Sequence, residues 1–330
     1  MFQKYKIKYC LIAIVSFFTG MLMTTMFFYF FEIHLQSIPK WSIGEYYVDN
    51  NNVLYDSKKN PVFTVNDFID YQKALFVADP FVYSGTDSLY MFYELGTKRS
   101  KSGWGGDIAL ATSNNGNKWN YRGVILSESV TLSFPSIYEI DDGHYLLVDS
   151  NESSNVRLFK AEEFPYNWTC IDTLLEGNKW TDPSIYYYNK NYFLFTTLKS
   201  TGNLHLFYSS NISGKYIEHP QSPIVKEDKK HSRNAGQIID IGGKLYRPTQ
   251  DCAKMYGEKV RLMKIDTLST NKYSEHEVEQ SPILYGSGKG WNKKKMHTFN
   301  AFNISESGYN VITDGSPVDY KHQIKIYRRK

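Results

Sequence analysis

The sequence predicts an all-β protein, a five-bladed β-propeller preceded by one N-terminal transmembrane helix. Three observations support this prediction: strand-forming residues are abundant, a polar entrance followed by a hairpin recurs five times, and a long apolar run lies near the N-terminus. Of the 330 residues 16% are aromatic, including 27 tyrosines and 20 phenylalanines, and aromatic side chains are enriched in strands. No long linker follows the apolar run, so the strands are expected to form one domain.

The apolar run, Tyr9 to Phe31, has 23 residues without a formal charge. A helix needs roughly 20 residues to cross a hydrocarbon core. Lysines precede the run within residues 1–8, which favours a cytoplasmic N-terminus and places the rest of the chain on the extracytoplasmic side. A cleaved signal peptide is the alternative, but its apolar core would be shorter and followed by small residues, whereas Phe27 to Phe31 is bulky. We therefore expect a single-pass membrane anchor at residues 9–31.

Five units of about fifty residues share one plan, in which a polar entrance precedes a strand, a tight turn and a returning strand. Units one and three begin with Ala78-Asp-Pro and Thr181-Asp-Pro, and the other three begin near positions 134, 234 and 298. Each unit has room for about four short strands, and four-stranded sheets repeated around an axis make a propeller with short, protected edges. A two-sheet sandwich is the alternative, but it leaves the repeated entrance unexplained.

The segments outside the repeats set the domain boundaries. Residues 32–70 are predicted to be a connection that includes a first strand at Trp41 to Val48, and residues 71–330 are predicted to form the propeller. The last strand, near Ile324 to Tyr327, is expected to close the ring with a strand from the N-terminal side of unit one.

Charge and cysteine content exclude two classes of protein. The net charge of +4 is small and spread along the chain, which gives no reason to expect a nucleic-acid partner. Three cysteines are too few for a disulfide scaffold. Cys170 and Cys252 could form one disulfide, or they could be two buried thiols.

The entrances are expected to bring polar side chains to one mouth, because the first strand of each propeller blade lines the central channel. These residues are Asp79, Ser136, Asp182, Arg233, Asn234, His297 and Asn300. Two converging carboxylates can perform acid–base or nucleophilic chemistry on an acetal. The alternative for each Asp-Pro is a turn in which the aspartate caps backbone amides. Trp104 is expected at the rim, where it could stack on a sugar or pack against the next blade.

A set of motifs between residues 38 and 330 carries a family resemblance: Lys40-Trp-Ser-Ile-Gly, Ala78-Asp-Pro-Phe, Phe134-Pro-Ser, Trp180-Thr-Asp-Pro-Ser, Arg233-Asn-Ala-Gly-Gln, Leu245-Tyr-Arg-Pro-Thr-Gln-Asp and Tyr256-Gly-Glu. They resemble the family 43 glycoside hydrolases of the arabinanase and levansucrase superfamily. They are more similar still to the N-terminal domain of glucosamine inositolphosphorylceramide transferase and its bacterial relatives. The family 43 resemblance implies that Asp79 is the base that activates a water or acceptor, and that Asp182 orients the general acid and tunes its pKa. It places His297 on the channel floor, near which an ion can bind, and a hydrogen-bonded structural histidine is the alternative.

One position departs from the family 43 pattern. Those enzymes carry the general acid, a Glu, at the opening of blade four, where this chain has Arg233. Asp251 and Glu258 are the nearest substitutes in that unit, although Glu258 could equally be an exposed turn residue. Arginine binds phosphate through two parallel hydrogen bonds and cannot deliver a proton at neutral pH. Arg233, with Arg247 nearby in the chain, therefore favours a sugar phosphate or nucleotide sugar; the alternative is an arginine paired with an entrance aspartate.

We expect from this a membrane-anchored, carbohydrate-active protein that acts on a glycan or an activated sugar, by glycosyl transfer rather than hydrolysis, in cell-surface polysaccharide or glycolipid metabolism. The candidate catalytic residues are Asp79, Asp182 and Asp251. The candidate substrate-binding residues are Arg233, Asn234, Arg247, Trp104, Ser136, His297 and Asn300. No zinc-type spacing and no Gly-rich phosphate loop is present in the sequence, so we expect no metal and no cofactor. The alternative is a non-catalytic module that binds a glycan or partners an assembly enzyme.

Overall fold

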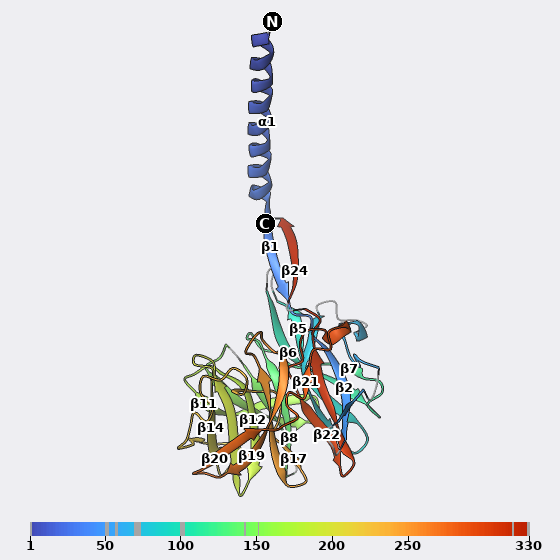
Figure 1. The fold of residues 1–330 in the computed structure, drawn as a ribbon, viewed down its shortest axis with the longest axis vertical. Coiled ribbons are helices and arrows are strands. Elements are labelled where there is room, and N and C mark those ends of the chain that lie inside the picture. Colours follow the sequence, from blue (N-terminus) through green and yellow to red (C-terminus); the bar gives the residue numbers. More distant parts are fainter. Residues whose placement is uncertain are drawn as a thin grey trace.

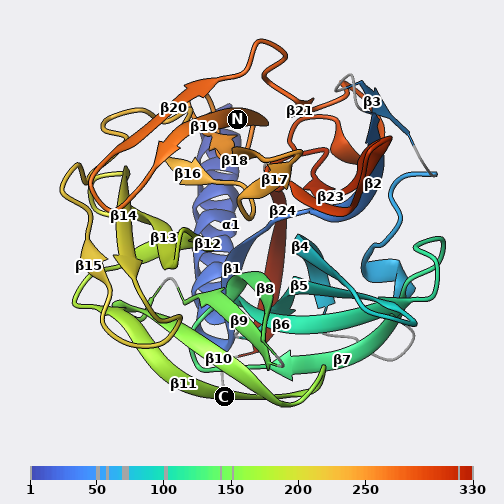
Figure 2. The same ribbon diagram turned by 90° about the horizontal axis from the view of Figure 1, so that it is seen from below.

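The computed structural model describes residues 2–49, 53–56, 59–68, 74–99, 103–141, 143–150, 152–318 and 320–328, without the side chains of residues 2–15, 34–36 and 323. Twenty-two of the 24 strands found in these residues form five sheets. The sheets stand around one axis, each as a blade (Figure 2). The predicted five-bladed β-propeller is therefore confirmed.

Each blade is antiparallel, and its first strand along the chain lies nearest the axis, apart from the composite fifth blade described below (Figure 2). Blade one contains β4 (Ala74–Ser84), β5 (Leu89–Lys98), β6 (Trp104–Ser113) and β7 (Asn120–Leu126). Blade two contains β8 (Ser133–Ile140), β9 (Gly143–Asp149), β10 (Asn155–Glu163) and β11 (Asn167–Glu176). Blade three contains β12 (Trp180–Tyr188), β13 (Asn191–Leu198), β14 (Asn203–Ser209) and β15 (Ile217–Glu218). Blade four contains β16 (Arg233–Asn234), β17 (Ile239–Ile241), β18 (Lys244–Asp251), β19 (Lys259–Leu268), β20 (Tyr273–Glu277) and β21 (Leu284–Tyr285).

The fifth blade closes the ring with strands from both ends of the chain. It contains β22 (Asn300–Ser305), β23 (Gly308–Gly315), β2 (Ser42–Asp49) and β3 (Leu54–Tyr55). The pairing of β2 with β23 runs from Ser42 opposite Gly315 to Asp49 opposite Gly308. A strand from the segment 32–70 thus lies between two other strands of a blade.

The expected closure by residues near Ile324 is wrong. These residues lie in β24 (Lys321–Arg328), which pairs with β1 (Phe31–Ile38) in a two-stranded ribbon outside the ring (Figure 1). A strand inside a blade is covered on both faces by the neighbouring blades. The central part of β2 is buried on both faces, whereas Ile324 and Ile326 are 70% and 56% exposed and alternate with charged or polar residues.

Apolar side chains fill the wedges between neighbouring blades. Between blades one and two, for example, Phe81 packs edge-to-face on Phe134 with ring centres 4.9 Å apart. Between blades five and one, Ile43 of β2 packs in one cluster with Val77 and Tyr93. Burial of one such side chain contributes about 1.5–3 kcal/mol. The wedges therefore hold the inner strands, and the residues at their mouths, in fixed positions.

The helix α1 (Phe2–Phe30) extends away from the propeller beyond the β1–β24 ribbon (Figure 1). Its described apolar side chains, from Phe17 to Phe30, are exposed. No helix is long and apolar enough to span a membrane when only the described residues are considered. The side chains of residues 9–15, the first part of the predicted anchor, lie outside them.

The two cysteines of the propeller do not pair. Cys170 is an exposed free thiol on β11, and Cys252 is a half-buried free thiol after β18. The disulfide alternative is therefore wrong, and so is burial of Cys170.

Candidate functional site

The two entrance aspartates have a left-handed backbone, with φ of +49° at Asp79 and +51° at Asp182. Such values are uncommon outside glycine and are held in place by surrounding contacts. The contact here is a carboxylate of the preceding blade: the Asp79 N–H donates to Asp314 Oδ2 (2.9 Å), and the Asp182 N–H donates to Asp149 Oδ2 (3.0 Å). The repeated Asp-Pro is therefore not a local turn cap; its amide is bound by the neighbouring blade and its carboxylate is left for other partners.

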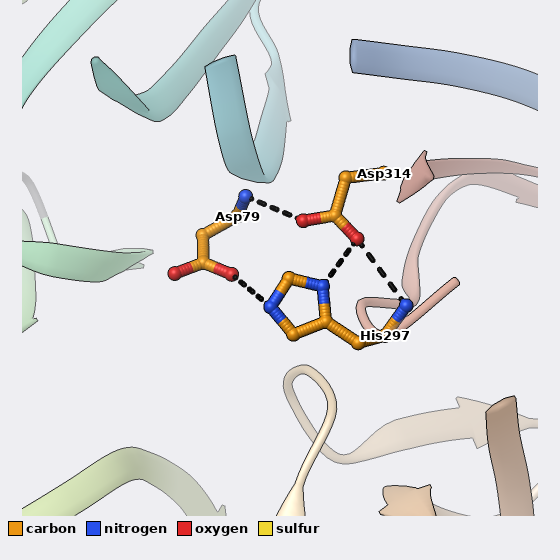
Figure 3. A group of neighbouring side chains, drawn as sticks. All are labelled: Asp79, His297 and Asp314. Carbon is orange, nitrogen blue, oxygen red and sulfur yellow. Dashed lines mark hydrogen bonds and ion pairs between the residues drawn. The ribbon is translucent and has the colours of Figure 1, made fainter. Parts of the chain in front are cut away.

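Asp79, His297 and Asp314 form a buried group at the inner ends of blades one and five (Figure 3). The His297 Nδ1 atom lies 2.6 Å from Asp314 Oδ1, and Nε2 lies 3.3 Å from Asp79 Oδ1. Burial lowers the pKa of His297, but the two carboxylates outweigh it and raise the pKa. Burial would raise the pKa of Asp314, but the contact with His297 holds it below its usual range. Burial raises the pKa of Asp79 to about 7, against the pull of His297.

The same three side chains place ligand atoms within 4.8 Å of one another, close enough to enclose a metal ion. The sequence spacing did not predict this cluster. Both ring nitrogens of His297 already face a carboxylate, and the raised pKa of His297 favours the imidazolium form, whose charge offsets part of the negative charge of the two carboxylates. The three side chains are thus linked by a series of contacts that ends at Asp79.

Asp182 is held by blade four. Its Oδ2 accepts hydrogen bonds from Arg233 Nε (2.6 Å) and Gln250 Nε2 (3.2 Å). The Arg233 guanidinium carbon also lies 5.1 Å from the centre of the Tyr256 ring. Of the two interpretations of Arg233, pairing with an entrance aspartate is therefore realised, while 25% of its side chain stays exposed.

A cavity of about 280 Å³ lies above these groups. Neither entrance aspartate lines it directly; Asp79 lies next to His297 and Asp182 next to Arg233, and these two partners do line it. The aromatic part of the wall is Trp41, Trp104 and Tyr256, and the charged part is Glu94, Lys199, Arg233, Lys295 and His297. Trp41 stacks on the His297 ring with centres 4.2 Å apart. Aromatic faces and paired charges in one small cavity suit a polar, ring-shaped ligand.

Glu94 is a cavity residue that the sequence analysis missed. It lies on β5 opposite Ala78, the residue before Asp79, and 7% of it is exposed. Burial, reinforced by the charge of Asp79, raises its pKa well above the usual range. Asp149 and Asp314 were missed as well. One sequence pattern could have indicated these three residues. In blades one, two and five, a carboxylate lies on a largely apolar strand that follows the hairpin turn.

Comparison with known proteins shows the family of the chain. The family described as glucosamine inositolphosphorylceramide transferase 1, N-terminal, matches residues 37–316. The chain belongs to this family. The glucosamine inositolphosphorylceramide transferase 1 of Oryza sativa subsp. japonica is 32% identical over 252 residues, which cover 74% of this chain and 33% of that protein. That of Arabidopsis thaliana is 31% identical over 302 residues, which cover 84% and 39%. The chain thus spans about a third of the length of these relatives.

Solved structures share the fold of this family member at low sequence identity. An α-L-arabinofuranosidase from Podospora anserina aligns over 89% of this chain and 98% of its own, with a TM-score of 0.59 and 12% identity. An α-L-arabinanase from Cellvibrio cellulosa aligns over 76% and 98%, with a TM-score of 0.53 and 15% identity. At such identities the likeness concerns the five-bladed propeller alone.

Several predicted site residues of this family member lie away from the cavity. Asp251 is buried against Arg261, whose Nε donates to its Oδ2 at 2.7 Å. Arg247 is fully buried and bonded to Glu275. Glu258 lies beside Lys259 and borders a separate hollow. The positions of Asp251 and Glu258 therefore do not favour a role as the missing acid.

Three other predicted residues support the channel wall. Asn234 donates through Nδ2 to the backbone carbonyl of Asp182 at 2.8 Å. Asn300 accepts the Val82 N–H at 2.7 Å. Ser136 is fully buried. Trp104, in contrast, lines the cavity as expected for a rim residue and packs edge-to-face on Phe76.

Larger hollows lie elsewhere among the described residues, including the one of about 360 Å³ that Glu258 borders. One of about 570 Å³ separates blades four and five and is lined mostly by apolar side chains such as Leu284 and Phe299. Another of about 970 Å³ lies on the outer side of blade one, next to Trp119. Neither is lined by an entrance aspartate or its partners. We assign the site by its chemistry rather than by cavity size.

Proposed function

We propose that this chain is a carbohydrate-active enzyme that transfers a glycosyl group, from a glycan or an activated sugar, in cell-surface polysaccharide or glycolipid metabolism. One observation supports it above the others: a single cavity combines aromatic faces, cations and a carboxyl directly above the two entrance aspartates. The relatives are named as transferases. Because the match covers only about a third of their length, their activity comes to this chain only as a proposal.

Asp79 is the proposed base. The carboxyl retains 9% exposure. Its Oδ1 faces His297 and its Oδ2 accepts the Phe134 N–H at 3.2 Å, so these two contacts would hold the carboxyl in place as it takes a proton from an acceptor hydroxyl. The hydroxyl oxygen then attacks the anomeric carbon as the bond to the leaving group breaks. Asp182, in its ion pair with Arg233, lies where a carboxylate can stabilise the positive charge that develops on the sugar ring.

The cations favour a substrate that carries phosphate. Arg233, Lys199 and Lys295 line the same cavity, and such groups bind phosphate oxygens through charge-assisted hydrogen bonds. The phosphate can belong to an activated donor or to the acceptor. The relatives' printed name describes an inositolphosphoryl group on a ceramide, which fits an acceptor phosphate.

The proposed location is the outer face of a membrane, with α1 as the anchor. Residues 9–31 are uncharged, and the apolar side chains of the described part of α1 are exposed. Pro39 and Tyr320, which adjoin the β1–β24 ribbon, line the cavity. An anchored α1 would therefore turn the cavity toward the membrane, where a glycolipid acceptor would be presented.

The location is testable through Cys170. Its thiol is exposed and unpaired, so a membrane-impermeant maleimide added to intact cells should label Cys252→Ser and leave the double variant Cys170→Ser/Cys252→Ser unlabelled. Labelling of Cys170 only after the membrane is permeabilised would contradict an extracytoplasmic propeller.

Activity is tested by incubating the full chain in lipid nanodiscs with panels of nucleotide sugars and oligosaccharides, in the presence of inositolphosphorylceramide. Wild type should release the leaving group and form a glycosylated product, detected by mass spectrometry. Asp79→Asn should lose about 100-fold or more in rate, since general-base catalysis contributes about 10²–10⁴-fold. Asp266→Asn, which changes an exposed carboxylate on β19, is the matched control and should keep the wild-type rate.

A non-catalytic glycan-binding or assembly module is the second candidate. It is favoured by one observation: the opening of blade four offers Arg233 where a carboxylate is expected, and that arginine already occupies Asp182. Equal glycan binding by wild type and Asp79→Asn, with no turnover by either, would decide for the module.

A further inference from the structure

We infer that Glu94 is the proton donor of this site, so that the donor substrate is a sugar joined to an alcohol oxygen, a leaving group that must be protonated as it departs. This inference rests on the proposed glycosyl transfer and makes it more specific. It also provides the general acid that the opening of blade four lacks, because the Glu94 carboxyl comes from blade one.

The position of Glu94 relative to the proposed base is set by β-sheet register. β4 and β5 pair antiparallel, with Ala78 directly opposite Glu94. Residues that face each other across such a pair have side chains on the same face. Asp79 follows Ala78 at the β-bulge of β4, and among the neighbouring charges that act on Glu94 that of Asp79 is the largest, so the two carboxyl groups lie close together on neighbouring strands. An acid and a base on either side of the scissile bond are what glycosyl transfer requires.

Glu94 also has direct access to a ligand. It is the one carboxylic side chain, among the described residues, that lines the cavity. It faces a wall that includes Trp41, Arg233 and Lys295, and a sugar held against the aromatic rings would lie between Glu94 and the cations. Asp149 and Asp314, in contrast, are occupied by the backbone amides of Asp182 and Asp79.

Packing fixes the carboxyl group in this place. A Cβ at Gly106 would stand 2.5 Å from Glu94 Oε1 and 2.3 Å from the Leu132 carbonyl oxygen. The space that the glycine leaves open is therefore the space that the glutamate occupies. A carboxyl group with one well-defined position is suited to delivering a proton to one atom of a bound substrate.

Electrostatics separate the roles of the two acids. Burial is the main cause that raises the pKa of Glu94, and the charges of Asp79, Asp149 and Asp314 act in the same direction. Asp79 has the opposing influence of the protonated His297, and its pKa is about 7. Burial and neighbouring negative charges therefore favour the acid form of Glu94, whereas His297 favours the carboxylate form of Asp79, and such a difference between two carboxyls is typical of an acid and a base.

The step balances as follows. The acceptor O–H bond breaks and its proton passes to Asp79, while the acceptor oxygen forms a bond to the anomeric carbon. The bond from that carbon to the leaving oxygen breaks with its electron pair on oxygen, and this oxygen takes the proton of Glu94. Product release and proton exchange with water return Asp79 to its carboxylate and Glu94 to its acid, so no net proton, oxidant or reductant is needed.

The test uses the full chain in nanodiscs, as wild type, Glu94→Gln and the matched control Glu176→Gln, which changes an exposed residue at the end of β11. Two probes of the sugar that wild type transfers are compared: its methyl glycoside, whose leaving oxygen needs a proton, and its 2,4-dinitrophenyl glycoside, whose leaving group does not. Glu94→Gln should lose about 10²–10⁴-fold in kcat/KM on the methyl glycoside and less than about 10-fold on the dinitrophenyl glycoside. The control should match wild type on both.

A second readout does not depend on turnover. The infrared difference spectrum between wild type and Glu94→Gln at pH 7 should contain the carbonyl band of a protonated carboxyl. Glu94→Asp, which keeps a carboxyl group but moves it back by one methylene, should show the same leaving-group selectivity as Glu94→Gln and provides a second variant if Glu94→Gln folds poorly. Equal losses on both probes, or no carboxyl band, would overturn the role of Glu94 alone. No turnover of any probe by wild type would overturn the proposed transfer itself and the role of Glu94 with it.

Discussion

Arg247→Met is expected to destabilise blade four and to leave the cavity intact, although the sequence favours a substrate-binding role for this arginine. The side chain is fully buried. Its Nε and Nη2 donate to the two carboxylate oxygens of Glu275, at 2.9 and 2.5 Å, and its Nη1 donates to Asn234 Oδ1 at 3.1 Å. Methionine removes these donors and leaves Glu275 with the hydroxyl of Tyr273.

The size of the effect follows from the burial of the pair. Removing one partner of a buried ion pair costs about 3–5 kcal/mol, because the remaining charge loses its compensation. In domains of about 150–250 residues each kcal/mol lowers Tm by about 2–4 °C, so a fall of roughly 6–20 °C is expected. Urea unfolding followed by tryptophan fluorescence should show a lower midpoint with an unchanged slope.

Two controls make the test specific. The double variant Arg247→Met/Glu275→Met should recover most of the loss, since apolar side chains often replace a buried ion pair at little cost. Arg122→Met, which removes a half-buried arginine bonded to Thr112, should lower the stability by about 1 kcal/mol or less. A wild-type unfolding midpoint in Arg247→Met, together with weakened binding of a sugar phosphate, would refute the structural role and restore the one expected from sequence.

Two further predictions concern pH and ring closure. The pKa of Asp79 is about 7 in the folded chain, against an ordinary value of 3.8. Between pH 4 and 7 the native state therefore keeps a proton that the unfolded chain has lost, and the contribution of Asp79 to the free energy of unfolding falls as the pH rises. Asp79→Asn should therefore gain a few kcal/mol relative to wild type across that window, and parallel urea midpoints would disprove the shift. Deletion of residues 1–49 removes β2 from blade five and should prevent cooperative folding, whereas deletion of residues 319–330 should leave the propeller folded. Near-ultraviolet circular dichroism distinguishes a folded from an unfolded propeller. A folded protein after deletion of residues 1–49 would contradict closure of the ring by β2.

The blades could be predicted from the sequence because their signals are local. Each entrance, strand and tight turn lies within about twenty residues, so that Ala78-Asp-Pro and Thr181-Asp-Pro mark blades one and three directly. Ring closure has no such signal. The pairs between β2 and β23 join residues more than 250 positions apart. The sequence Lys321 to Arg328 has the pattern of a strand, and this pattern alone does not show whether the strand closes a blade or forms an outer ribbon.

The sequence indicated the polar side chains that begin a blade, but it did not indicate the carboxylates on the second strands of blades one, two and five. Asp79 and Asp182 lie next to the cavity, but Glu94 reads in the sequence as an ordinary strand residue. The placement of Asp251 shows a second limit. Neighbouring residues in a strand point to opposite faces, so Gln250 reaches Asp182 while Asp251 turns away toward Arg261. Sequence spacing identifies the strand but not which face meets the cavity.

The way in which the fifth blade is assembled affects the order of events during synthesis. The strand β2 leaves the ribosome early, but its partner β23 follows more than 250 residues later. At about 5–20 residues per second, the wait is roughly 13–50 s. Throughout that time the growing chain carries an unpaired edge, and the channel between blades five and one stays open. The cavity can therefore be completed only after β23 has been synthesised and has paired with β2.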